Sequence, residues 1–177
     1  FRLRATQGTS YRAPGLYELY LGDQSSFADQ LSIDPCIDWQ NSTNANIRTN
    51  CAAEGIPGDF TGGASSATVY SGGGAGVLEP ETSDARTVGL VYTPEWAALS
   101  VALDYFEIEV YDQIAQLGAA SILYSCYSGT TFPNNFCNLF DRADGSSQVS
   151  PYAILEVQDS YLNINSQITD EAIASAY

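Results

Sequence analysis

The sequence of 177 residues contains no lysine, histidine or methionine, and its six basic residues are all arginines. Its 21 acidic residues give a formal net charge of -15 at pH 7. Nucleic acid is an improbable partner, because a chain without a basic patch cannot displace counterions from a phosphate backbone. The missing histidine removes the commonest general base, the commonest zinc ligand and any Ser-His or Cys-His dyad.

Carboxylates are the only reactive groups left in quantity. They suit a calcium site or a two-carboxylate glycosidase, and they equally keep an extracellular surface soluble through mutual repulsion. Along one expected strand, Glu107 and Glu109 share a face, whereas Asp104 lies an odd number of residues from Glu107 and faces the other side. We therefore expect no enzyme, no catalytic residue, no metal site and no cofactor.

Long hydrophobic runs are also missing, since no segment approaches the roughly 18 apolar residues of a transmembrane helix. A transmembrane β-barrel needs only segments of about ten residues with alternating polarity. Such alternation is found over residues 1–12, 84–93 and 98–111, and strand-like sequence returns over residues 152–177. Residues 93–97 contain Pro94 and predict a tight antiparallel hairpin between the second and third segments.

The third segment changes polarity along one face. Its apolar side chains Leu99, Val101, Leu103 and Tyr105 alternate, and Glu107 then continues the same face. This change is typical of a strand that leaves lipid at an aromatic boundary, and a β-bulge would also produce it.

Two long segments, residues 14–77 and 113–148, lack clear periodicity and are predicted to be loops. Four cysteines permit three connectivities, and the short spacing within each loop favours local pairing. Disulfides would place the loops in an oxidising compartment. The alternative of four free buried thiols fits less well, because the neighbouring residues are polar. The expected pairs are Cys36 with Cys51 and Cys126 with Cys137.

Three ordered segments resemble one family. YRAPGLYELYLG (11–22), VLEPETSDARTVGLVYTPEW (77–96) and LSVALDYFEIEVYDQI (99–114) are similar, in order and spacing, to motifs of the TonB-dependent outer-membrane receptors. Each motif alone is weak, but the ordered set is specific.

The resemblance implies an all-β fold, an antiparallel transmembrane β-barrel of which residues 1–177 form a part, with about four to five strands and two long disulfide-containing extracellular loops. It implies a Gram-negative outer membrane, and it places the plug domain and the C-terminal end of the barrel outside this chain. The implied partners are outer-membrane lipid, a small-molecule or oligosaccharide ligand, and the TonB energy-transducing complex, reached through the missing plug domain.

The implied function is a receptor that binds a scarce solute, such as a ferric siderophore, a cobalamin or an oligosaccharide, and imports it with TonB-supplied energy. The alternative is a secreted, disulfide-stabilised β-sandwich that binds or hydrolyses carbohydrate.

Two groups of residues are candidates for the functional site. The first follows the family motifs and is expected to hold loop to barrel, with contact to ligand as the alternative; an ion pair with Arg12 or Arg86 would explain the glutamates at 79 and 81. Its members are Arg12, Pro14, Glu18, Glu79, Pro80 and Glu81. The second is a set of aromatics that could stack on a ligand or pack the loops together. Its members are Tyr17, Tyr20, Trp39, Tyr124 and Tyr127.

Overall fold

The computed structural model describes residues 1–62, 65–148, 150–164 and 167–176. The chain divides into two compact units, each described separately below. We call the first the sheet unit; it consists of Phe1–Leu19, Ala75–Ala115 and the residues from Leu162 onward. We call the second the loop unit; it consists of Tyr20–Gly74 and Gln116–Tyr161.

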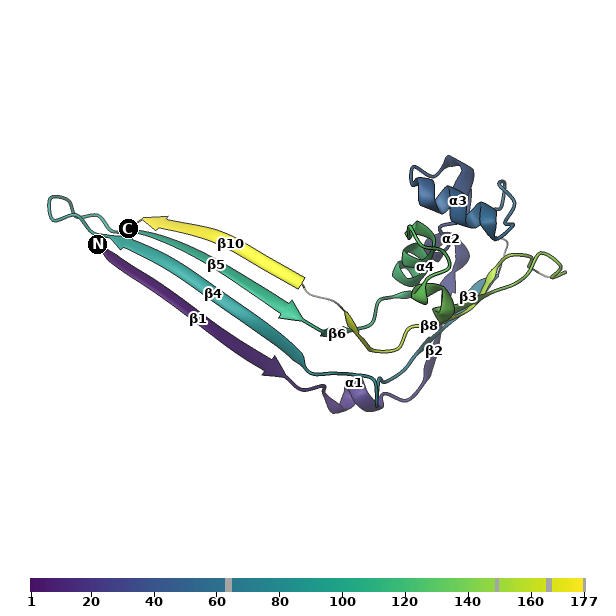
Figure 1. Cartoon of the computed structure of the whole chain (residues 1–177), viewed down its shortest axis with the longest axis horizontal. Coiled ribbons are helices and arrows are strands. Elements are labelled where there is room, and N and C mark those ends of the chain that lie inside the picture. The colour runs from purple at the N-terminus through teal and green to yellow at the C-terminus, as the bar shows by residue number, and fades with distance from the viewer. Residues whose placement is uncertain (63–64, 149, 165–166, 177) are drawn as a thin grey trace. The chain divides into compact units, whose positions relative to one another are not determined.

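A four-stranded antiparallel sheet dominates the sheet unit (Figure 1). Its strands follow the order β1-β4-β5-β10, and β1 and β10 are its outer strands. The bounds are Arg2–Arg12 for β1, Glu81–Tyr92 for β4, Val101–Tyr111 for β5 and Gln167–Ala176 for β10. Two short strands, β6 (Gln113–Ala115) and β9 (Leu162–Ile164), form a second antiparallel pair.

The connections differ greatly between the two ends of this sheet. At one end, residues 93–100 join β4 to β5, so the connection is longer than the predicted 93–97 and takes in Leu99, which we expected in the strand. At the other end the chain leaves twice, as a first excursion of residues 13–80 between β1 and β4 and as a second excursion of residues 112–166 between β5 and β10. The helix α1 (Leu16–Tyr20) lies near the start of the first excursion.

The two faces of the sheet carry different side chains. Because direct partners in neighbouring strands project to the same side, the register assigns each residue to a face. The face that contains Leu103, here the Leu103 face, has an apolar half formed by Leu3, Ala5, Val88, Leu90, Leu103, Tyr105, Ala172 and Ala174. The opposite side, the Asp104 face, carries Arg4, Thr6, Ser10, Ser83, Thr87 and Asp104 beside Phe106 and Ile108.

Beyond Tyr105 the Leu103 face becomes polar. Arg86, Glu107 and Asp170 form one row across three strands, and Asp84 and Glu109 lie in the next row. The pairing of β4 with β5 runs from Tyr92 opposite Val101 to Thr82 opposite Tyr111 without a register shift. The predicted polarity change is therefore present within a regular strand, and the β-bulge that we considered as its cause is not.

The loop unit is built from both excursions. The first supplies β2 (Gln24–Asp29), α2 (Gln30–Ile33), the 3-10 helix η1 (Trp39–Asn41), α3 (Ala45–Ala53) and β3 (Ser66–Ser71). The second supplies α4 (Ala119–Ser128), the 3-10 helix η2 (Asn135–Leu139), β7 (Phe140–Arg142) and β8 (Ile154–Gln158). Their strands form one sheet of order β2-β3-β8-β7, in which the parallel pair β3 and β8 joins the two excursions.

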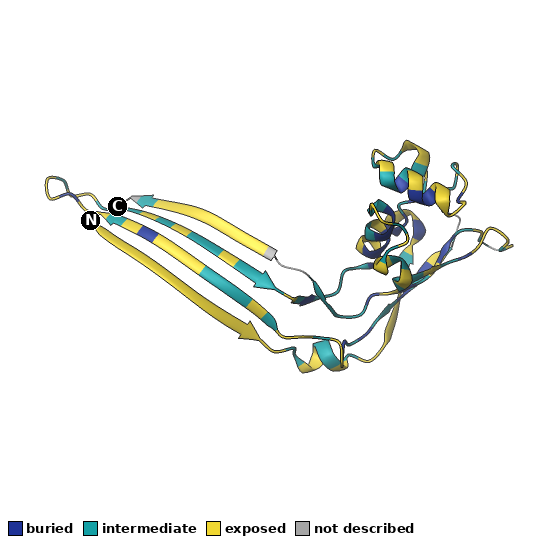
Figure 2. Cartoon of the chain, in the orientation of Figure 1, coloured by how far each residue is buried: buried dark blue, intermediate teal, exposed yellow. Residues whose placement is uncertain are grey.

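The segments that we predicted to be loops thus contain helices and a sheet of their own. In α4 the buried residues Ala119, Ile122, Leu123 and Cys126 recur at helical spacing, and Ala120 and Tyr124 face outward. In α3 the side chain of Asn44 caps the helix by accepting a hydrogen bond from the Asn46 amide. Figure 2 shows the buried residues of the loop unit gathered in its helices and central strands, whereas β1 is exposed along its length.

Candidate functional site

Each excursion contains one disulfide, and both lie in the loop unit. Cys36 bonds Cys51 with a Cα–Cα distance of 5.7 Å, and Cys126 bonds Cys137 with a Cα–Cα distance of 5.0 Å. These are the two local pairs that the sequence predicts. Cys36 and Cys51 are fully buried, so the first bridge is part of the core.

A buried ion pair joins the two excursions. Arg142 in the second excursion donates from Nη1 and Nη2 to the two carboxylate oxygens of Asp34 in the first, both at 2.8 Å. The side chains are only 5% and 0% exposed. The Arg142 guanidinium also donates to the Tyr152 carbonyl and, from Nε, to the Tyr127 hydroxyl at 2.9 Å. Because the pair is buried and bidentate, it fixes the position of one excursion against the other.

Tyr127 lies at the centre of this network. Its ring is fully buried, is 5.6 Å from the Phe132 ring between centroids, and has the Arg142 guanidinium carbon 5.2 Å from its centroid. Its hydroxyl donates to the Glu54 carboxylate. Burial raises the pKa of Tyr127 above its ordinary value, and Glu54 adds to the rise while the charge of Arg142 opposes it. Burial acts to lower the pKa of Arg142, but the hydrogen bonds and charge of Asp34 outweigh it and the pKa is raised.

Two buried amides, Gln30 and Asn50, form further cross-links between the excursions. Gln30 is fully buried, and its side chain donates to the Ile154 carbonyl at 2.7 Å while accepting from the Ile154 amide at 3.0 Å. The side chain of Asn50 donates to the carbonyls of Tyr127 at 2.8 Å and Gly129 at 3.0 Å. Both amides satisfy backbone groups that would otherwise be buried without partners.

The family-motif residues meet in the sheet unit, where the first excursion leaves β1 and returns to β4. Arg12 at the end of β1 donates to the Glu81 carboxylate twice at 2.7 Å and to both Glu18 oxygens at 3.0 Å. Glu18 also accepts from the Gly15 amide at 2.7 Å, and Glu81 accepts from the Ile114 amide at 2.7 Å. This Arg12 cluster holds the end of β1, the helix α1, the start of β4 and the strand β6 together.

The remaining motif residues flank the cluster. Pro14 precedes α1, and Pro80 directly precedes β4. Glu79 makes its described contacts through its backbone, which donates to the Asn163 side chain at 2.8 Å and accepts from it at 2.9 Å. Of the two glutamates for which we expected an ion pair, Glu81 therefore pairs with Arg12, and none is described for Glu79 among residues 1–62, 65–148, 150–164 and 167–176.

The candidate stacking aromatics divide by exposure. Tyr17, Tyr20 and Tyr124 are 64%, 70% and 53% exposed. Trp39 packs partly against the core and donates to the Pro57 carbonyl at 3.0 Å. Tyr127, buried as described above, has no surface for a ligand in this structure, so the packing alternative applies to it. Gln30, Asp34 and Asn50 were not selected from the sequence. Arg142 could have been noticed, because it is one of only two arginines in the sequence of the loop unit.

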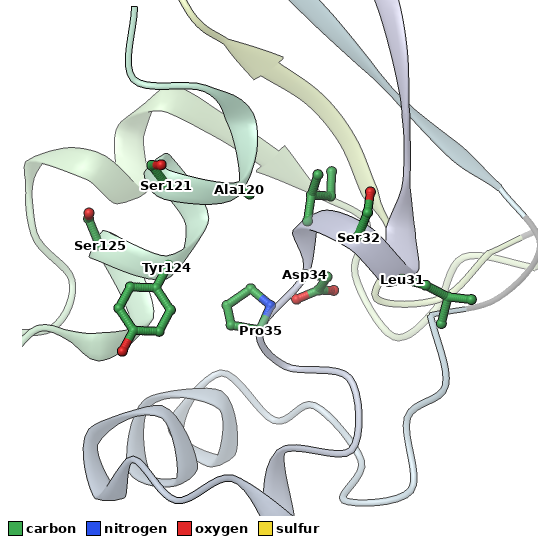
Figure 3. Close-up of a pocket in the computed structure, with 9 residues that line it drawn as sticks. Leu31, Ser32, Asp34, Pro35, Ala120, Ser121, Tyr124 and Ser125 are labelled. Carbon is green, nitrogen blue, oxygen red and sulfur yellow. The ribbon is translucent and has the colours of Figure 1, made fainter.

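A groove of about 440 Å³ opens between the two excursions within the loop unit (Figure 3). One wall is formed by residues 31–35, which include the end of α2, and the other by α4. Tyr124 of α4 and Pro35 lie on these two walls. The lining consists of Leu31, Ser32, Ile33, Asp34, Pro35, Ala120, Ser121, Tyr124 and Ser125.

The part of the chain that the structure describes contains no group of three or more Cys, Asp or Glu residues arranged to hold a metal ion. None of its helices is both long and apolar enough to cross a membrane. The segment with Asp144, which vaguely resembles a calcium loop, is a turn in which the Asp144 carboxylate accepts from the Ser146 amide at 2.8 Å.

An amphipathic antiparallel sheet whose long connections all leave from one end is the arrangement of a wall segment in an outer-membrane β-barrel. The family described as TonB dependent receptor-like, beta-barrel matches residues 1–167, and the chain belongs to this family. The family comprises transport receptors of the outer membrane and is not a class of enzymes.

Among solved structures, the chain is similar to a mutant ferric enterobactin receptor from Pseudomonas aeruginosa in complex with enterobactin. The similarity covers 97% of this chain at 18% sequence identity, with a TM-score of 0.47. This chain spans 17% of the length of that receptor. No curated protein matches the chain.

Proposed function

We propose that this chain supplies part of the wall and two surface loops of an outer-membrane receptor that binds a scarce solute and imports it with energy from the TonB complex. The solute classes that the family suggests are ferric siderophores, cobalamins and oligosaccharides. The loop unit is the part that meets the solute outside the cell. The coupling to TonB belongs to a plug domain.

The observation that carries this proposal is the polarity of the Leu103 face. Leu3, Leu90 and Leu103 form an apolar row across three neighbouring strands, and Leu3 and Leu103 are more than half exposed. The apolar half ends at Tyr105, and Glu107 follows on the same face. A strand that crosses lipid and emerges at a ring of aromatic side chains has this order of residues.

The connections support an orientation in which the loop unit lies outside the cell. Barrels of the outer membrane have short turns on the periplasmic side and long loops on the outer side. The 93–100 turn is the short connection, and both excursions leave the opposite end of the sheet. The two disulfides of the loop unit agree with this orientation, since they require an oxidising compartment.

The exposed aromatics of each unit are proposed, separately, as contacts for the ligand. Tyr124 lines the groove, and Tyr17 and Tyr20 project from α1 with most of their surface exposed. The Arg12 cluster, whose charges pair with one another, is proposed to anchor the loops rather than to bind the solute.

The alternative, a secreted β-sandwich that binds or hydrolyses carbohydrate, would need the Leu103 face to pack against a second sheet. The family match over residues 1–167 favours the receptor.

Two neighbouring substitutions on opposite faces of β5 test the proposal. Leu103→Arg places a charge in the apolar half of the Leu103 face, where lipid would make it cost about 2–4 kcal/mol. Ala102→Arg, the matched control, places the same charge on the side that would line a watery lumen. We expect Leu103→Arg to lower the amount of heat-resistant receptor in the outer-membrane fraction severalfold and Ala102→Arg to leave it near wild type.

The cellular location of the wild-type protein distinguishes a sandwich from a receptor. A sandwich that packs the Leu103 face leaves Ala102 in water and would respond to the two substitutions in the same order, but the wild-type protein would appear in the soluble periplasmic or secreted fraction. That location would refute the receptor, and so would loss of folding in Ala102→Arg, because a watery lumen tolerates the charge.

A further inference from the structure

The groove of the loop unit presents hydroxyl groups beside an exposed ring. Ser121 and Ser125 lie one helical turn apart on α4, and Tyr124 lies between them in sequence. On the facing wall, the Ser32 hydroxyl donates to the Asp29 carbonyl at 2.7 Å and keeps its oxygen as an acceptor. Hydroxyl groups can both donate and accept, so this lining suits a ligand that is itself rich in hydroxyls.

The groove offers no charged side chain to a ligand. The only carboxylate in its lining belongs to Asp34, whose side chain is 0% exposed and is bound by Arg142 and by the Cys36 amide at 2.9 Å. Arg142 is also buried, and the other arginine of the unit, Arg48, donates to the Ser42 carbonyl. The lining is therefore uncharged where a ligand can reach it.

The surrounding unit is strongly acidic. Its two segments contain ten acidic residues and two arginines. An anionic ligand would find no countercharge in the groove and would be repelled on approach, because charge complementarity governs both encounter and selection.

The groove walls are held by covalent bonds on both sides. Pro35 directly precedes Cys36, and Ser125 directly precedes Cys126, so each wall ends at a disulfide. The ion pair of Asp34 with Arg142 additionally joins the wall of residues 31–35 to the second excursion. A preformed groove loses little conformational entropy when a ligand binds.

We propose that this groove binds an uncharged solute with several hydroxyl groups, such as a neutral oligosaccharide. The Tyr124 ring packs against the apolar face of a sugar ring, Leu31 and Pro35 line the opposite wall, and the serine hydroxyls exchange hydrogen bonds with the sugar hydroxyls. The inference rests on the proposed function, because it names the class of solute that the receptor takes up.

The test is calorimetric titration of the purified receptor that contains this chain. The probes are three neutral oligosaccharides (maltohexaose, cellohexaose and xylohexaose), an anionic oligogalacturonate of similar length, and ferric enterobactin. We expect at least one neutral probe to bind and the anionic probes not to bind. Tyr124→Ala should weaken that binding roughly tenfold or more.

Two further variants separate the groove from general effects. Phe27→Ala removes an aromatic ring that is 76% exposed in the same unit and outside the groove lining, so it should change the affinity less than twofold. Ser121→Arg adds a cation to the groove, which should weaken the binding of the neutral probe and allow oligogalacturonate to bind.

The inference is overturned if no neutral probe binds in a manner that depends on Tyr124, or if wild type binds oligogalacturonate or ferric enterobactin and Tyr124→Ala weakens that binding. These outcomes leave the proposed function intact when the receptor still assembles in the outer membrane and Leu103→Arg still lowers the assembled amount severalfold. Failure of the membrane assay would instead refute the proposed function itself.

Discussion

Removing the charge of Arg142 tests whether the two excursions depend on each other. The substitution Arg142→Met keeps most of the side-chain length and removes the bonds to Asp34, Tyr127 and Tyr152. It leaves the Asp34 carboxylate buried, with the Cys36 amide as its remaining described donor.

The expected cost follows from burial. Both side chains of the pair are at most 5% exposed, and removing one partner of such a pair typically costs about 3–5 kcal/mol, because an uncompensated charge stays in the interior. Removing both charges costs much less, since the attraction within a buried ion pair exceeds the desolvation cost of its two charges by only a little. We expect Asp34→Asn combined with Arg142→Met to recover more than half of the loss.

Amide hydrogen exchange measures this effect in each unit separately. In Arg142→Met, peptides from α4 should exchange between about a hundredfold and a few thousandfold faster, as 1.4 kcal/mol corresponds to a factor of ten. Peptides from β4 in the sheet unit serve as the internal control and should keep their wild-type rates. Exchange rates of α4 within threefold of wild type in Arg142→Met would refute the reasoning. So would exchange in the Asp34→Asn, Arg142→Met double variant as fast as in Arg142→Met alone.

Three further predictions concern other parts of the molecule. The pKa of Tyr127 is raised in the folded state, so as the pH rises this tyrosine ionises first in the unfolded chain, near pH 10. The free energy of unfolding of the loop unit should therefore be constant below about pH 10 and fall above it. Tyr127→Phe should reduce this fall, as measured by urea unfolding between pH 8 and pH 11. Reducing the Cys36–Cys51 disulfide, whose cysteines are 15 residues apart, should lower the stability of the loop unit by about 3 kcal/mol. Amide exchange in α3 should then be faster, and unchanged exchange after verified reduction would contradict this. Arg12→Ala should destabilise α1 and β6 by roughly 1–2 kcal/mol, because two carboxylates lose a partly exposed partner, whereas Arg2→Ala on the same strand should leave their exchange unchanged.

The wall of the sheet could be predicted from the sequence because its signal is local. Alternation along residues 98–111 assigns Leu103 and Asp104 to opposite faces without any knowledge of the neighbouring strands, and the structure confirms this assignment. The cysteine pairs were predictable for the same reason, since each closes a short loop. The exact end of the β4–β5 connection was not, because residues 98–100 alternate like a strand without pairing as one.

The loop unit could not be predicted because its order comes from contacts between residues far apart in the sequence. Gln30 and Ile154 are 124 residues apart, and neither shows in its own neighbourhood that it pairs with the other. A local signal of secondary structure existed for α4, whose residues Ile122, Leu123 and Cys126 have helical spacing inside a segment otherwise rich in Ser, Asn and Gly. The groove depends on this long-range pairing, so Tyr124 could be selected from the sequence while its opposite wall could not.

The parallel pairing of β3 with β8 has a consequence for engineering and for variation between receptors. If one excursion were replaced by its counterpart from another receptor, the remaining strand, β3 or β8, would lose its native partner. Either Asp34 or Arg142 would also be left without its ion-pair partner in the interior. A chimaera should therefore mature only when both excursions come from the same parent. The smallest segment that can be moved between barrels of this kind is the pair of excursions, and ligand specificity would change only when both excursions are exchanged together.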